Sequence, residues 1–366
     1  SACSESCDYC GRSANEPIAA PADDVMEPIG AAFYEVYTDP VHVAAYESAE
    51  GGYLVPTTDT ADAVEGLFGG FFSDDFQEAI AEAISGQTWI VCDSDPYGLS
   101  YSEVLKFGWD DFVRHVKHRS RYFFSVPEDE DREDRESISP SDFLARLSSM
   151  IEDLGLIRDS DAPWFRARIH PVEVSVDSGG TLGTPEEAPY SNRMSPAGIC
   201  MFYGSFERDT ALQEFLDPLK SSDGKRITTG LFRPSRSLRV LDLREIPPPP
   251  SYFDLERRDE YVVKTFLKGF VEDLAKPISK DGLEHIEYVP TQVVTEYFRR
   301  AYRDGDQRID GILYPSSRRE GGSCCVLFFE HEQCVDDRRR TSKGTLIEDW
   351  LVLECDTLMA EDLRRI

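Results

Sequence analysis

The spacing of apolar residues changes once along this 366-residue chain, and that change constrains its fold more than any other feature. Before about residue 159 the apolar positions recur with helical periodicity. After residues 159–163, short apolar runs alternate with helical stretches. We therefore predict an α+β protein with two domains. A mainly helical domain covers residues 1–160, and a mixed α/β domain with a C-terminal extension covers residues 161–366.

The periodicity also predicts the individual elements of both domains. In the first domain we expect helices at 24–48, 74–86, 101–119 and 139–154, with an exposed acidic loop from Glu128 to Glu136. In the second we expect helices at 210–216, 252–275 and 290–303, and strands at 164–170, 199–203, 231–232, 238–243, 309–314 and 324–329. Thr210 and Gln213 have the spacing of a capping box.

Charge and apolar content exclude several classes of partner. The formal net charge is −30, and such a surface repels nucleic-acid backbones and anionic membranes. No apolar run is long enough to span a bilayer, and no signal peptide is visible, so we expect a cytoplasmic protein. Cys324 and Cys325 stand in an apolar run, which favours buried thiols in a reducing compartment over a disulfide.

Three cysteines near the start of the sequence suggest a structural metal. Cys7 and Cys10 have the Cys-x2-Cys-Gly spacing of half a tetrahedral zinc site, and Cys3 is a further ligand candidate. No downstream Cys-x2-Cys or His-x3-His pair completes the site, so a structural zinc would need Cys3 and a distant ligand such as His42 or Cys92. The alternative is a tight turn, or a tail with free thiols.

Three segments of the second domain carry residues suited to one chemistry. Arg166 and Arg168 alternate along a predicted strand and therefore share a face. The segment 192–205 contains Arg193 and Tyr203 and is followed by Glu214 on a predicted helix. The segment 311–317 ends in Tyr-Pro-Ser-Ser, which contains Ser316.

In the order and spacing of these residues, the chain resembles the RES domain family over about residues 160–335. The family is named for an Arg, a Glu and a Ser. Arg-x-x-Pro-x-Gly at 193–198 is similar to the family's Arg-Trp-Asn-Pro-x-Gly, with Met194 and Ser195 as departures. Tyr203 precedes the helical Glu214 by eleven residues, as in the family. The N-terminal half resembles the HEPN-associated domain that is fused to some RES domains.

The resemblance implies an ADP-ribosyltransferase-like fold and a toxin that degrades NAD⁺ by hydrolysis or phosphorolysis. It implies inorganic phosphate as a possible co-substrate and an antitoxin or regulatory protein as a partner. The residue types suit this chemistry. Paired guanidinium groups bind a diphosphate, and a carboxylate stabilises an oxocarbenium-like ribose. The predicted catalytic residues are Glu214, Arg166, Ser316 and Tyr203, and the predicted NAD⁺-binding residues are Arg166, Arg168, Arg193, Tyr203 and Ser316.

Other interpretations remain open. Arg166 and Arg168 are alternatively surface cations, Glu214 a support of the helix dipole, and Tyr203 a core residue. The same fold also suits transfer of ADP-ribose to a protein, or a sensor that binds a nucleotide without turnover. Arg114 and His118 stand one helical turn apart, one residue short of the Arg-x4–6-His motif of HEPN ribonucleases.

Overall fold

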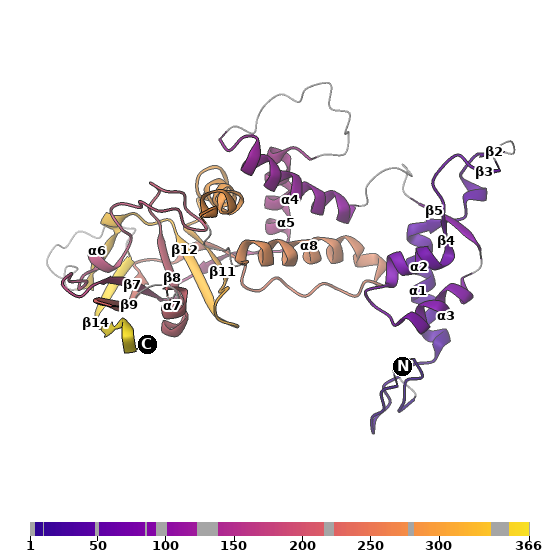
Figure 1. The fold of residues 1–366 in the computed structure, drawn as a ribbon, viewed down its shortest axis with the longest axis horizontal. Coiled ribbons are helices and arrows are strands. Elements are labelled where there is room, and N and C mark those ends of the chain that lie inside the picture. Colours follow the sequence, from indigo (N-terminus) through magenta and orange to yellow (C-terminus); the bar gives the residue numbers. More distant parts are fainter. Residues whose placement is uncertain are drawn as a thin grey trace. The chain divides into compact units, whose positions relative to one another are not determined.

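The computed structural model describes residues 4–9, 11–47, 51–84, 86–92, 101–122, 138–215, 223–276, 282–337 and 351–365. The chain forms two compact units. One comprises Ser1–Glu103 and Pro248–Val263, and the other comprises Val104–Pro247 and Lys264–Ile366. The predicted α+β class is confirmed, because helices are combined with a large mixed sheet (Figure 1).

The first unit is built from short helices and very short strands. Its helices are α1 (Ala22–Val36), α2 (Thr60–Phe68) and α3 (Asp74–Ala83), and η2 (Leu255–Arg257) is a 3₁₀ turn. A three-stranded sheet has the order β1 (Tyr37–Thr38), β5 (Thr88–Val91), β4 (Thr58–Asp59), and β2 (Tyr46–Glu47) pairs with β3 (Gly52–Tyr53). The core of this unit includes Phe33, Phe68 and Trp89.

The helix predicted at 24–48 is too long. It ends at Val36, because Tyr37 and Thr38 pair with β5 as strand β1. Asp39 then caps a 3₁₀ turn, η1 (Pro40–His42), in which Asp39 Oδ1 accepts the Val41 N–H at 2.9 Å. Aromatic and β-branched residues followed by Asp-Pro favour a strand and a turn over a continuing helix.

The second unit contains three long helices besides its sheet. They are α4 (Tyr101–His118), α5 (Pro140–Asp153) and α8 (Arg258–Ala275), and the unit division falls within α4 and α8. The Trp109 ring lies 5.6 Å from Phe112, 5.6 Å from Phe143 and 4.9 Å from Phe270. Because this aromatic packing joins the three helices, residues 104–160 group with the second unit. The sequence placed them in the first domain.

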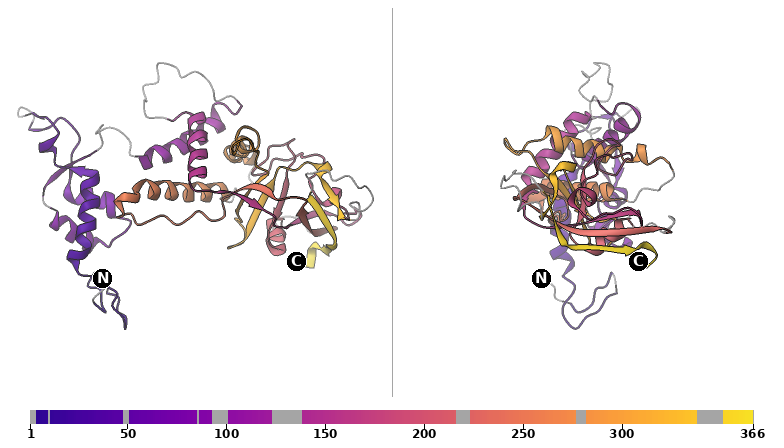
Figure 2. Two further views of the ribbon diagram at one scale, coloured as in Figure 1. Left: turned by 180° about the vertical axis from the view of Figure 1, so that it is seen from behind. Right: turned by 90° about the vertical axis from the view of Figure 1, so that its left-hand side faces the viewer.

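A nine-stranded mixed sheet forms the rest of the second unit. Its order is β13-β14-β9-β7-β8-β12-β11-β10-β6, and all pairs are antiparallel except β10–β11 and β13–β14. The strands are β6 (Ile157–Ser160), β7 (Trp164–Pro171), β8 (Phe202–Ser205), β9 (Lys225–Pro234), β10 (Leu238–Asp242), β11 (Gly311–Pro315), β12 (Ser323–Leu327), β13 (Cys334–Asp336) and β14 (Leu351–Asp362). β14 lies beside β9 (Figure 2).

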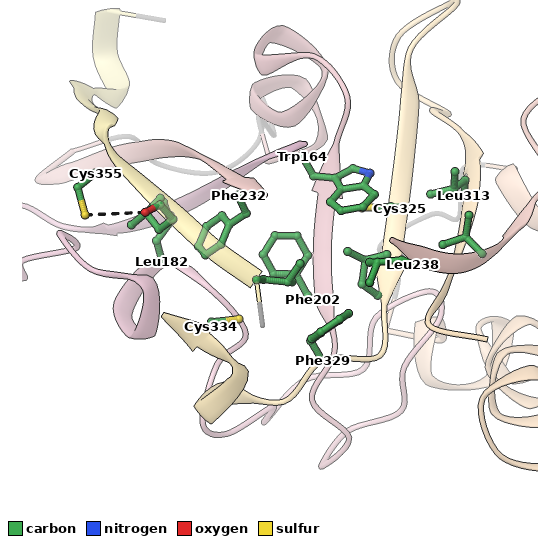
Figure 3. Packing of buried hydrophobic residues seen from close by; sticks show 14 of the residues in the cluster. Trp164, Leu182, Phe202, Phe232, Leu238, Leu313, Cys325, Phe329, Cys334 and Cys355 are labelled. Atoms are coloured by element: carbon green, nitrogen blue, oxygen red, sulfur yellow. Dashed lines mark hydrogen bonds between the residues drawn. The ribbon is translucent and has the colours of Figure 1, made fainter. Parts of the chain in front are cut away.

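The two halves of this sheet meet at one residue pair. β7 shares eight pairs with β9 but only Phe165↔Ser205 with β8. One face carries the larger apolar cluster, in which Trp164, Phe202 and Phe232 gather (Figure 3). The short helix α6 (Gly179–Leu182) joins this cluster through Leu182.

Helix α7 (Arg208–Phe215) packs on the other face of β7. Its Ala211 and Leu212 contact Ala167, with Phe165 and Ile169 beside them. The remaining elements of this unit are α9 (Glu284–Glu287), α10 (Val289–Glu296), the π-helical turn η3 (Tyr297–Ala301) and the 3₁₀ turns η4 (His331–Gln333) and η5 (Leu363–Arg365). In the described ranges, no helix combines the length and apolarity that crossing a bilayer requires.

Candidate active site

Glu214 and Ser316 are in direct contact, although they stand 102 positions apart in the chain. Ser316 follows β11, and its Oγ donates a hydrogen bond to Glu214 Oε1 at 2.5 Å. The same Oγ accepts the backbone N–H groups of Arg318 and Arg319, each at 3.2 Å. The hydroxyl is therefore fixed in orientation, and it holds one oxygen of the carboxylate. Within the described residues, no hydrogen bond involves the other oxygen, Oε2.

Glu214 is the seventh residue of α7, which begins at Arg208, so it lies beyond the first turn of the helix. A helix dipole stabilises acids at the N-terminus and disfavours them at the C-terminus. The interpretation of Glu214 as a support of the helix dipole is therefore wrong. Its side chain is half-buried and is held by tertiary contacts instead.

Three more polar groups lie on the sheet face that Glu214 contacts. Cys324 Sγ is 3.5 Å from Glu214 Oε1. Tyr314 is paired with Cys324, and Tyr203 is paired with Val326 of the same strand, so these side chains share one face. The Tyr203 hydroxyl lies 2.9 Å from Ser195 Oγ. This face thus presents a carboxylate, a hydroxyl, a thiol and two phenols.

Helix α10 holds the loop that carries Arg193. Thr291 Oγ1 donates to the Arg193 carbonyl, and Gln292 Nε2 donates to the carbonyls of Asn192 at 2.8 Å and Ser195 at 3.2 Å. Thr291 and Gln292 are buried. The sequence indicated Thr291 as the N-cap of a helix and gave neither residue a part in the site; the N-cap of α10 is Tyr288 instead. The only signal available was their place near a helix start, which does not predict hydrogen bonds to the distant loop that carries Arg193.

Two guanidinium groups lie next to the Glu214–Ser316 pair. Arg193 Nη1 donates to the Leu274 carbonyl at 2.7 Å, and Arg193 Nη2 lies 3.5 Å from the hydroxyl of Ser317. Arg319 Nη1 donates to Thr210 Oγ1 at 2.9 Å, one helical turn before Glu214. The sequence predicted Arg193 as a ligand of NAD⁺ but did not single out Arg319.

Arg166 and Arg168 lie on the opposite face of the sheet from Glu214. Arg166 Nε donates to the Leu182 carbonyl at 2.8 Å, and its Nη1 donates to the Tyr203 carbonyl at 2.5 Å, where β7 and β8 separate. Arg168 Nη1 donates to the Thr181 carbonyl. Successive side chains of a strand point to opposite faces of the sheet. Because Phe165 and Ala167 face α7, Arg166 and Arg168 face the other side. Of the predicted site residues, Arg166 and Arg168 therefore lie across the sheet from Glu214, Tyr203 and Ser316.

Arg166 is buried, with 8% of its surface exposed, and its guanidinium lies 5.1 Å from the centre of the Phe202 ring. Burial lowers the pKa of Arg166 to about 10, so the group stays charged at neutral pH. Gly230 is paired with Arg166 across β7 and β9. A side chain at Gly230 would begin 2.7 Å from Leu182 and 2.8 Å from Leu353, so glycine leaves the space that this crowded face needs.

Ionisable groups buried on the Glu214 face predict a loss of stability at alkaline pH. Burial, followed by the nearby charge of Glu214, raises the pKa of Cys324 from 9.0 to about 12. Burial also raises the pKa of Tyr203 from 10.0 to about 12 and that of Tyr314 well above 10.0. The folded protein then binds more protons than the unfolded chain, so stability is complete below about pH 9 and falls as the pH rises towards 12. Urea unfolding at pH 8 and at pH 10 measures this loss as a lower midpoint concentration of urea at pH 10. The Cys324→Ala variant should show a smaller difference between the two midpoints. Equal midpoints at the two pH values in the original chain would contradict the prediction.

The predicted zinc site falls largely outside the described residues, since Cys3 and Cys10 are not among them. Cys7 is described, and its carbonyl accepts the Gly11 N–H at 2.9 Å in a tight turn. Gly11 has φ +66°, a conformation that favours glycine. Among the described residues, no group of three or more His, Cys, Asp or Glu side chains is placed to hold a metal ion.

Comparison with protein families agrees with the order of these motifs. Residues 163–349 match the RES domain, and residues 1–130 match HEPN/RES N-terminal domain 1. The chain belongs to the RES domain family. This family is associated with NAD-related, toxin-like activity. No curated protein and no solved structure matches the chain, so the expected likeness to ADP-ribosyltransferases stays a prediction.

Proposed function

We propose that this RES protein cleaves the bond between nicotinamide and ribose in NAD⁺. The observation that carries the proposal is the Glu214 carboxylate. One of its oxygens is fixed by Ser316 at 2.5 Å, and its half-buried position leaves it accessible. A carboxylate fixed in orientation before the substrate binds stabilises developing positive charge without having to reorganise during the reaction.

Cleavage of the bond between nicotinamide and ribose requires few protein groups besides this carboxylate. When the C1′–N1 bond breaks, its electron pair leaves with nicotinamide, which becomes neutral, so the leaving group needs no proton. Positive charge develops on the ribose as an oxocarbenium-like species, which the Glu214 carboxylate stabilises. Water then forms the new bond to C1′ and loses a proton, or phosphate forms it directly. The products are nicotinamide with ADP-ribose or with its 1-phosphate.

The neighbouring residues suit the rest of the dinucleotide. Guanidinium groups bind diphosphates through paired hydrogen bonds, and Arg193 and Arg319 both lie close to the Glu214–Ser316 pair. The phenols of Tyr203 and Tyr314 provide aromatic faces for the nicotinamide ring. For phosphorolysis, Arg193 is also suited to orient the attacking anion.

Chromatography of the products after mixing the full chain with NAD⁺ tests this proposal. We expect nicotinamide to be released in step with loss of NAD⁺, and a rate that rises with added phosphate identifies phosphorolysis. With labelled NAD⁺ and cell lysate, label on protein would identify ADP-ribose transfer. Binding of NAD⁺ without any release of nicotinamide, with water and with phosphate, would contradict the proposal and favour a nucleotide sensor.

A further inference from the structure

A pocket rich in arginine lies at the other end of the β11–β12 hairpin from Ser316. We call it the arginine pocket, and its charged lining consists of Arg236, Arg299, Arg300, Arg308, Asp310 and Glu330. Asp310 directly precedes β11, whereas Ser316 directly follows it. The five residues of β11 span about 16 Å, so the pocket is separate from the Glu214 site.

A π-helical turn places two consecutive arginines in this pocket. η3 continues α10, and the Tyr302 N–H donates to the Tyr297 carbonyl five residues back, at 2.9 Å. Both Arg299 and Arg300 then line the pocket. Such π turns are rare and occur frequently at functional sites.

The acids of the arginine pocket neutralise only part of its positive charge. Arg236 forms a bidentate pair with Asp310, at 2.7 and 2.8 Å. The buried Arg299, with 8% of its surface exposed, is 3.1 Å from Glu296 and 4.0 Å from Glu330. In the described part of the chain, Arg300 and Arg308 form no side-chain hydrogen bond or ion pair. Within the described residues, Arg300 and Arg308 thus leave two guanidinium groups unneutralised beside the buried Arg299.

We propose that the arginine pocket binds a phosphate group, as the free dianion or as the monoester of a small molecule. The cavity is about 210 Å³, smaller than the roughly 300 Å³ at which drug-sized ligand sites begin, so it suits one tetrahedral anion. Guanidinium groups match phosphate geometry through paired hydrogen bonds. Phe328 and Phe329 also line the pocket and provide an apolar wall for the rest of a monoester. The proposal does not depend on cleavage of NAD⁺.

Calorimetric titration of the full chain at low ionic strength, without NAD⁺, tests the proposal. One titration uses inorganic phosphate and a second uses AMP. Comparing them shows whether the pocket binds the free ion or a phosphate monoester. We expect binding in at least one titration, and the double variant R300A/R308A should weaken it by at least about tenfold, since each lost contact is charge-assisted. Both replaced side chains are exposed, so folding is expected to persist, and circular dichroism checks this.

The matched control is R146A, which removes an exposed arginine from α5. It should bind like the original chain, which excludes a general effect of lost charge. Binding by R300A/R308A that equals binding by R146A would overturn the proposal, and so would the absence of heat in both titrations. A phosphate site at Glu214 would survive in R300A/R308A, so the two proposals can fail independently.

Discussion

Glu214→Gln is expected to slow nicotinamide release from NAD⁺ by about a hundredfold to a thousandfold. The amide keeps the volume of the side chain, and its oxygen still accepts the Ser316 hydroxyl, now found at 2.5 Å from Glu214 Oε1. What is lost is the negative charge that faces the oxocarbenium-like ribose. The initial rate of nicotinamide release at saturating NAD⁺ measures the effect, and an unchanged melting temperature shows that the fold persists.

Asp209→Asn is the matched control for this variant. Asp209 lies on the same helix, is exposed, and forms no hydrogen bond or ion pair within the described residues. Its rate should stay within about twofold of the original, since surface charges are largely screened. Equal rates for the Glu214→Gln and Asp209→Asn variants would remove Glu214 from the chemistry.

Arg166→Met is expected to destabilise the second unit by roughly 3 kcal/mol. The variant leaves the carbonyls of Leu182 and Tyr203 without their donors, found at 2.8 and 2.5 Å, and an unpaired buried acceptor costs about 1–3 kcal/mol. For a unit of this size the melting temperature should fall by about 6–12 °C. Thermal melting followed by circular dichroism measures this.

Arg168→Met provides the comparison, because Arg168 is half-buried and donates to one carbonyl, that of Thr181. It should lower the melting temperature by less than half as much. The two variants also distinguish a catalytic role of Arg166 from a structural one. An Arg166→Met variant that melts like the original but no longer cleaves NAD⁺ would support the catalytic role predicted from the sequence and contradict the structural one.

Most of the elements of the second unit were predictable, because each has its own periodic pattern. The helix start at Ser139, whose Oγ accepts the Asp142 N–H at 3.1 Å, and the strand beginning at Trp164 agree with the prediction. The strand predicted at 199–203 lies at Phe202–Ser205 instead. Thr210 does not cap α7, because the helix begins at Arg208 and the Thr210 hydroxyl donates to Glu207 at 2.8 Å.

The candidate site was predictable only in part. Glu214, Ser316 and Tyr203 stand in recognisable local motifs, and they share one face of the sheet. The placement of Arg166 depends on which face of β7 is covered by α7, and a local pattern of alternation does not distinguish the two faces. Arg319, Thr291 and Gln292 act through contacts with residues about 100 positions away, for which the sequence has no local signal.

The pairing of β14 with β9 matters for how this protein is divided experimentally. The RES match ends at residue 349, before β14 begins at Leu351, yet β14 forms eight residue pairs with β9 and contributes the buried Leu351 and Leu353. A fragment that ends at residue 349 would lack β14 and would expose the unpaired hydrogen-bonding edge of the ten-residue strand β9. Bare edges of that kind recruit other chains and aggregate. Fragments intended to carry the activity should therefore extend through Asp362.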